Sequence, residues 1–169
     1  MATTFEDPKY LDDVYVALLE LLSQATFPPG SGLAFATVER VVQLPSEIPA
    51  SSQPALLLFE GPLHATSLIR FEETPRDLFG PLKWIFTAIA VIYLRADGVV
   101  GLSAKPSQIA NYIIWGIVNS FNVMPPYGKQ TLGGLVYHAW IEGEVIPQVA
   151  DQQVIITVPI HMIPGPVGD

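Results

Sequence analysis

The stretch that decides the fold is Gln130–Pro164, QTLGGLVYHAWIEGEVIPQVADQQVIITVPIHMIP, in the last third of the chain. Two long runs of strand-like composition flank Pro147–Gln152, a segment with a proline, an aspartate and one strong strand former, Val149. This pattern predicts a hairpin of two long antiparallel strands with its turn in that segment. The pair Gly133-Gly134 is expected to let the chain turn sharply into the first strand at Leu135.

Upstream of the hairpin, the spacing of apolar residues predicts two amphipathic helices. The first covers about Pro8–Ala25, with Asp7 as its N-cap, and the second begins at Lys105-Pro106-Ser107 and ends near Asn122. Gly116 lies on the apolar stripe of the second helix, which predicts a close approach to another backbone, that of the sheet. Strands are expected over three further ranges, 33–44, 55–60 and 82–96.

The order of these elements predicts an α+β fold, with two helices packed on a mainly antiparallel sheet that includes the long C-terminal hairpin. The stretch 82–96 is apolar on both faces, so it should be a central strand with something packed on each side. A chain of 169 residues fits one domain, residues 1–169. The stretch Leu63–Gly80 mixes charged and turn residues and predicts a protruding surface arm or long loop.

The composition limits the classes of function. Hydrophobic residues make up 50% of the chain and charged residues only 14%, which is typical either of a protein with large interfaces or of a monomer with a large core. The net charge of −8 argues against tight binding of duplex DNA, and the lack of cysteine excludes disulfides and thiolate chemistry. The N-terminus carries no secretory pattern, and the apolar run Trp84–Leu94 is too short to span a membrane, so we expect folding in a cytoplasm.

One strand of the predicted hairpin carries the candidate residues for catalysis. His138, Trp140, Glu142 and Glu144 alternate and should share one face, where His161 of the partner strand could join them in metal binding or acid-base chemistry. The alternative is a solvated or subunit-facing side of a sheet, opposite a packed side formed by Leu135, Tyr137, Ala139, Ile141 and Val145. Lys129 precedes the two glycines, so the pattern is not a phosphate loop. We therefore expect no enzyme, no metal and no cofactor.

The residues from Tyr127 to Pro164 resemble the tail-terminator proteins of long-tailed bacteriophages. Three parts carry the resemblance: the Gln130–Gly134 turn, the strand His138–Glu144, and the final apolar strand that ends in Ile160–Pro164. The order of helices and strands along the chain is similar to that family's in outline.

The resemblance implies a structural virion protein that forms a ring, usually a hexamer, at the head-proximal end of the tail. The ring caps the tail tube, stops its polymerisation and offers its other face to a neck or head-completion protein. Genome DNA passes through the lumen without specific binding, no membrane is involved, and assembly takes place in the host cytoplasm. A stack of acidic copies could line such a channel with charge that DNA slides past.

The resemblance also suggests where partners bind. Contacts with a neighbour are expected in the segment 63–80, in the loop Tyr127–Thr131, and at Trp140; the residues concerned are Arg70, Glu72, Glu73, Arg76, Asp77, Tyr127, Lys129, Gln130, Thr131 and Trp140. Glu142 and Glu144 are the candidates for the channel or wet face. Trp115 is a second candidate anchor, although ordinary core packing within its helix is the alternative. Two rival functions remain: another neck or head-tail adaptor ring, and a small cytoplasmic enzyme or ligand-binding domain.

Overall fold

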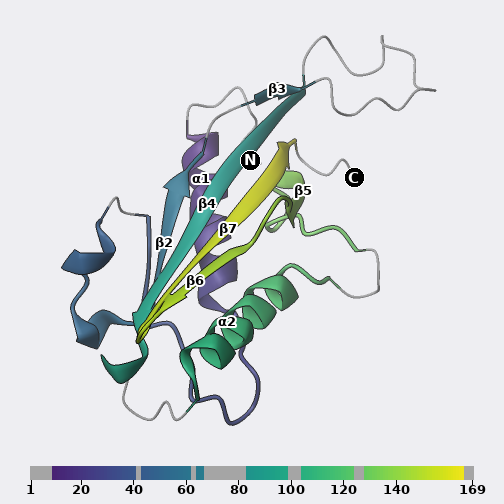
Figure 1. The fold of residues 1–169 in the computed structure, drawn as a ribbon. Coiled ribbons are helices and arrows are strands. Elements are labelled where there is room, and N and C mark those ends of the chain that lie inside the picture. The colour runs from purple at the N-terminus through teal and green to yellow at the C-terminus, as the bar shows by residue number, and fades with distance from the viewer. Residues whose placement is uncertain are drawn as a thin grey trace.

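The computed structural model describes residues 9–40, 43–61, 64–66, 83–98, 104–123 and 128–165, which form two α-helices and one seven-stranded sheet (Figure 1). The helices are α1, Tyr10–Ser23, and α2, Pro106–Ser120. The strands are β1, Thr37–Glu39; β2, Ala55–Glu60; β3, His64–Thr66; β4, Lys83–Arg95; β5, Val136–Ile141; β6, Ile146–Ala150; and β7, Gln153–Pro164.

The sheet has the order β1-β2-β4-β7-β5, with β3 added to β4 and β6 added to β7. Every pair is antiparallel except β1 with β2. The longest ladder joins β4 to β7, from Phe86 opposite Met162 to Arg95 opposite Gln153. The predicted α+β class, the mainly antiparallel sheet and the central position of β4 are confirmed.

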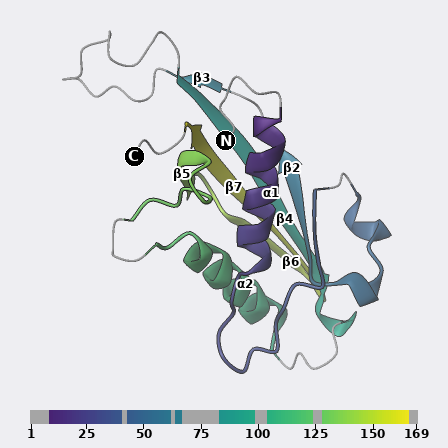
Figure 2. The same cartoon turned by 180° about the vertical axis from the view of Figure 1, so that it is seen from behind.

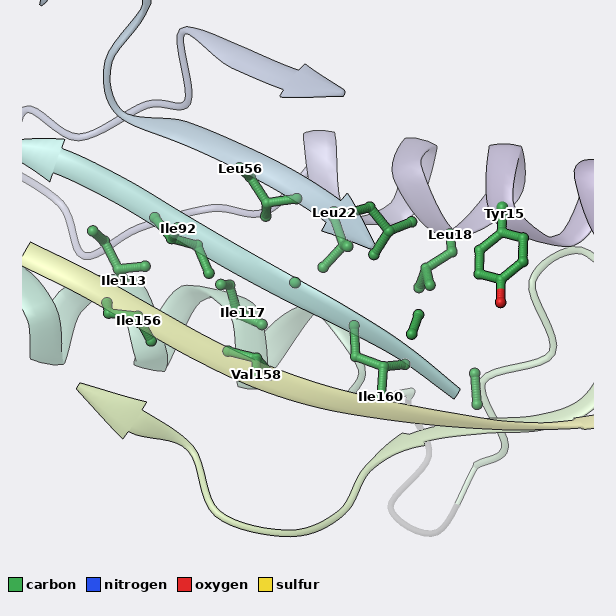
Figure 3. Packing of buried hydrophobic residues seen from close by; sticks show 14 of the residues in the cluster. Tyr15, Leu18, Leu22, Leu56, Ile92, Ile113, Ile117, Ile156, Val158 and Ile160 are labelled. Atoms are coloured by element: carbon green, nitrogen blue, oxygen red, sulfur yellow. The ribbon is translucent and has the colours of Figure 1, made fainter. Parts of the chain in front are cut away.

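Both helices pack on the same face of the sheet (Figures 2 and 3). Alternate residues of β4 and β7 point to this face, where they meet the apolar stripes of the two helices. From α1 the fully buried side chains include Tyr10, Val14, Leu18 and Leu22, and from α2 they include Ile109, Ile113 and Ile117. Each such side chain contributes about 1.5–3 kcal/mol as an upper estimate, so the helices are core elements.

The opposite face of β4, which we call the outer face, is covered at one end by the turns between β1 and β2. Ile48 packs there with Leu57 and Tyr93. The buried side chain of Gln53 donates a hydrogen bond to the Ile48 carbonyl (3.0 Å) and accepts one from the Arg95 N–H (2.7 Å). Something therefore packs on each side of β4, as expected: on the outer face the turns before β2 cover the end near Arg95, and Ile85 and Thr87 are buried toward the other end.

The C-terminal hairpin is confirmed, with its turn and first strand placed differently from the prediction. β6 occupies most of the segment 147–152 that we expected to be the turn, and the turn itself is Asp151–Gln152. The outgoing strand is interrupted at 142–145, which separates β5 from β6. Pro147 is tolerated because β6 lies at an edge of the described sheet, where a missing N–H need not break a ladder.

Three further predictions need correction. The strand expected at 33–44 is only the three residues of β1. Helix α1 begins at Tyr10 with Lys9 at its N-cap, while Asp7 and Pro8 lie outside the described residues. In α2, a Cβ added at Gly116 would lie 2.6 Å from Cδ1 of Phe27 and 2.8 Å from the Thr26 carbonyl oxygen, so Gly116 approaches the segment after α1 and not the sheet.

The expected arm Leu63–Gly80 begins with a short strand. Residues His64–Thr66 form β3 and pair with Lys83–Ile85 at the start of β4. This part of β4 extends beyond the register that β4 shares with β2 and β7 (Figure 1). Arg70, Glu72, Glu73, Arg76 and Asp77 lie outside the described residues.

Candidate interaction surface

The loop before β5 is held in place by Gln130. Its carbonyl accepts a hydrogen bond from the Ala139 N–H (2.8 Å), its side-chain oxygen accepts one from the Leu132 N–H (3.1 Å), and its side-chain amide donates to the Ser120 carbonyl of α2 (3.5 Å). Gln130 thus links the loop, β5 and the end of α2. Its role within the chain is structural, whatever it contacts outside.

The turn into β5 uses three successive residues with positive φ. These are Leu132, Gly133 and Gly134, at +49°, +71° and +89°. The Thr131 carbonyl accepts hydrogen bonds from the Gly134 N–H (3.0 Å) and the Val136 N–H (3.1 Å). The sharp turn predicted from the glycine pair is confirmed, because glycine adopts positive φ without the penalty of a Cβ.

Lys129 and Tyr137 form an exposed pair beside this turn. The Lys129 Nζ lies 3.3 Å from the centre of the Tyr137 ring, a cation–π contact. We expected Tyr137 on the packed side of the strand, which is wrong, because it is exposed. A β-bulge between Val136 and His138 breaks the strict alternation of side chains along this strand. As a result Val136 and Ala139 lie in the core, and Tyr137 between them does not.

Three rings stack on the outer face of the sheet at this end. His138 and Trp140 have ring centres 5.4 Å apart and planes inclined by 17°; Trp140 and His161 are 5.8 Å apart and inclined by 28°. His161 lies directly opposite Trp140 in the ladder of β5 and β7. All three side chains are partly buried. They make a firm aromatic surface of the kind that anchors protein interfaces.

The polar groups around this ring stack support the packing of its three side chains. Burial lowers the pKa of His138 below its usual 6.5, so its imidazole is neutral at pH 7. The Trp140 Nε1 donates a hydrogen bond of 2.6 Å to a carboxylate oxygen of Glu142, which fixes the indole. Glu142 and Glu144 follow the end of β5, so the predicted alternation does not continue to them. Among the described residues no group of three or more histidines and carboxylates is placed to hold a metal ion.

The structure therefore brings together five of the residues that we singled out: Lys129, Gln130, Thr131, Trp140 and Glu142. Glu144 is exposed in the connection between β5 and β6, and Tyr127 lies outside the described residues. Trp115 lies on α2 and is exposed, so the alternative of core packing is wrong for it. Tyr137 was missed because its exposure depends on the bulge, which leaves no clear sign in the sequence.

A pocket of about 540 Å³ lies at the other end of the outer face. Its walls come from the turns before β2 and from the ends of β4 and β7, and include Leu44, Ile48, Gln53, Tyr93, Arg95 and Ile155. The Gln53 side chain already hydrogen-bonds to the chain itself. The pocket is thus separate from the ring stack and offers mainly apolar contacts.

Comparison with known proteins does not identify a family for this chain. A scan of the chain against protein-family models finds no match, and a search of curated proteins finds none either. Neither of the described helices is long and apolar enough to cross a membrane.

Proposed function

We propose that this chain is a tail terminator of a long-tailed bacteriophage, a structural protein that forms a ring on the head-proximal end of the tail tube. One observation carries the proposal: the residues that resemble the terminator family, 127–164, include an aromatic surface at the end of β5. Lys129 on Tyr137, and Trp140 stacked with His161, give this surface large and well-fixed side chains. Interfaces are enriched in such side chains.

The proposed mechanism is mechanical. The ring of six copies occupies the growing end of the tube and so blocks addition of the next tube subunit, while its other face receives a neck or head-completion protein. Six copies at −8 each would carry −48, and such an excess disfavours adhesion of the DNA that passes through the lumen. The mechanism needs no metal, cofactor or catalytic group.

Deletion of the gene from an assembling phage tests the proposal. Loss of a terminator leaves the tube without a stop, so electron microscopy should show overlong tails that lack heads. Tails of normal length that fail to join heads would instead identify the chain as a neck adaptor, the second candidate. Normal, infectious particles would refute both virion roles.

The proposal that Glu142 and Glu144 line the channel is tested by removing their charge while keeping the size of their side chains. Glu142→Gln with Glu144→Gln should leave the fold intact, because both side chains are exposed, and should lower infectivity or DNA passage. Asp151→Asn, in the exposed turn between β6 and β7, is the matched control and should have no effect. If the double variant infects as well as the control, these two carboxylates have no role in the channel.

A further inference from the structure

Charge is distributed unevenly along the chain and over the fold. Between Pro106 and Gly168 only four residues are Asp, Glu, Lys or Arg: Lys129, Glu142, Glu144 and Asp151. Helix α2 and strand β6 contain none at all. The N-terminal elements differ, since α1 alone contains Asp12, Asp13 and Glu20.

The charge-free elements α2 and β6 lie next to each other (Figure 1). Trp115 and Val118 project from α2 and Val149 projects from β6; each exposes between 42% and 49% of its surface. Val149 lies opposite Val154, a core residue on the helix side of the sheet, so Val149 is on the side of β6 that faces α2. We call these three residues, with the rest of α2's exposed side and the side of β6 that faces α2, the neutral surface.

The neutral surface has the properties of a covered surface. It holds three of the seven exposed large apolar side chains of the described residues. All five residues of β6 are exposed, and within the described sheet β6 pairs only with β7. Free strand edges are commonly protected by charged side chains or by proline. Strand β6 contains no charged side chain, and Pro147 is its only residue of either kind.

The distribution of charge indicates which partner binds the neutral surface. A partner of opposite charge would be recognised by acidic groups, and the neutral surface has none to offer. Two copies of this chain, each at −8, repel each other, and a contact that buried carboxylates would add a desolvation cost. Contact through the neutral surface avoids that cost. We propose that the neutral surface of α2 and β6 binds a second copy of this chain.

Two elements, α2 and β6, set the extent of the neutral surface. Helix α2 is about 22 Å long from its 15 residues, and β6 adds a strip of about 17 Å from its five residues. A stable interface buries about 800 Å² per partner, which is roughly 8% of the 10277 Å² surface of this chain. Trp115, exposed near the middle of α2, is the expected anchor.

This inference rests on the proposed function in one respect only: it names one of the two patches through which each subunit of the proposed ring contacts its neighbours. The contact itself can exist without any role in a phage tail. Deletion of the gene tests the tail function, whereas the mass of the purified chain and its variants tests the contact. The two ideas can therefore fail separately.

The test uses the full chain and a matched pair of valines. Val118 on α2 and Val16 on α1 are both exposed helical valines, at 42% and 60%, and Val16 lies outside the neutral surface. Sedimentation and native mass spectrometry should show self-association of the wild-type chain at about 100 µM or below. Val118→Lys should weaken that association at least about tenfold, and Val16→Lys should leave it unchanged. Val149→Lys provides an independent second variant on β6, and circular dichroism verifies folding.

Several results would overturn the inference. One is a wild-type chain that stays monomeric at about 100 µM. Another is association of Val118→Lys and Val149→Lys with wild-type strength, or equal weakening by Val16→Lys. If the two neutral-surface variants assemble normally but fail to join tails, the surface binds a different partner and the proposal is wrong.

Discussion

Substitution of Gly116 by alanine tests the close contact between α2 and the segment that follows α1. In a solvent-exposed helix this change normally stabilises the protein by about 1 kcal/mol, because glycine has the greater backbone freedom in the unfolded chain. Gly116 is buried, however, and its added Cβ would lie 2.6 and 2.7 Å from two ring carbons of Phe27 and 2.8 Å from the Thr26 carbonyl oxygen. Either contact requires the neighbouring chain to move.

The expected effect follows from these two opposing contributions. Forcing a methyl group into a packed site costs about 1–3 kcal/mol, and the upper part of that range, about 2–3 kcal/mol, applies here because the Thr26 contact involves backbone, which cannot rotate away. The ring of Phe27 is also restrained, since it packs edge-on against Phe35 at 5.1 Å. After subtraction of the helix-propensity gain, we expect Gly116→Ala to lower the free energy of unfolding by about 1–2 kcal/mol.

Urea unfolding followed by circular dichroism measures this loss. Asn111→Ala, at an exposed position of the same helix, is the control and should stabilise the protein slightly. In a Phe27→Ala background, the cost of Gly116→Ala should shrink, because the ring contact is gone. A Gly116→Ala variant as stable as the wild type would refute the close contact. An undiminished cost in the Phe27→Ala background would assign the loss to the Thr26 backbone alone.

Three other predictions concern charge and pH. Burial raises the pKa of Tyr15 to about 12, so the unfolded chain loses this proton first and stability should fall as pH rises from 10 to 12; Tyr15→Phe should remove that part of the fall in urea midpoints. Burial lowers the pKa of His138, so stability should decline as pH drops below 6.5, and His138→Gln should reduce the decline. Arg40→Gln should cost about 1 kcal/mol in urea unfolding, because its partly buried guanidinium bonds Asp12 and Glu60, whereas Arg95→Gln should have no measurable effect.

The sheet and the helices were predictable because their residues follow simple periods. The run 82–96 is apolar on both faces apart from Lys83, Thr87 and Arg95, and it forms the central strand β4. The second helix begins where Lys105 and Pro106 indicated, and Gln108 supports its start by accepting a hydrogen bond from the Lys105 N–H (3.1 Å). In both cases local sequence and tertiary packing favour the same structure.

The errors fall where backbone geometry decides without a periodic signal. Glu142 and Glu144 continue the alternation of β5, yet Gly143 between them has φ of +103° and the strand has ended. Gly116 indicated a close approach, but no pattern could name Phe27 as the neighbour. The exposure of Trp115 could have been predicted, because Trp115 does not share the spacing of Ile109, Ile113 and Ile117. The core buries only one side of this helix.

Strand β7 connects the two surfaces discussed above. On the outer face its His161 supports Trp140, and on the helix side its Val154 and Ile156 lie among the core residues that α2 packs against, while β6 pairs along its edge. A substitution in the core of β7 would therefore disturb both surfaces at once. Changes at exposed positions, such as Val118 on α2 and Trp140 on β5, act on one surface each. If Trp140→Ala impairs tail joining while self-association is preserved, and Val118→Lys impairs self-association itself, the two surfaces serve different partners, as a ring between a tube and a neck requires.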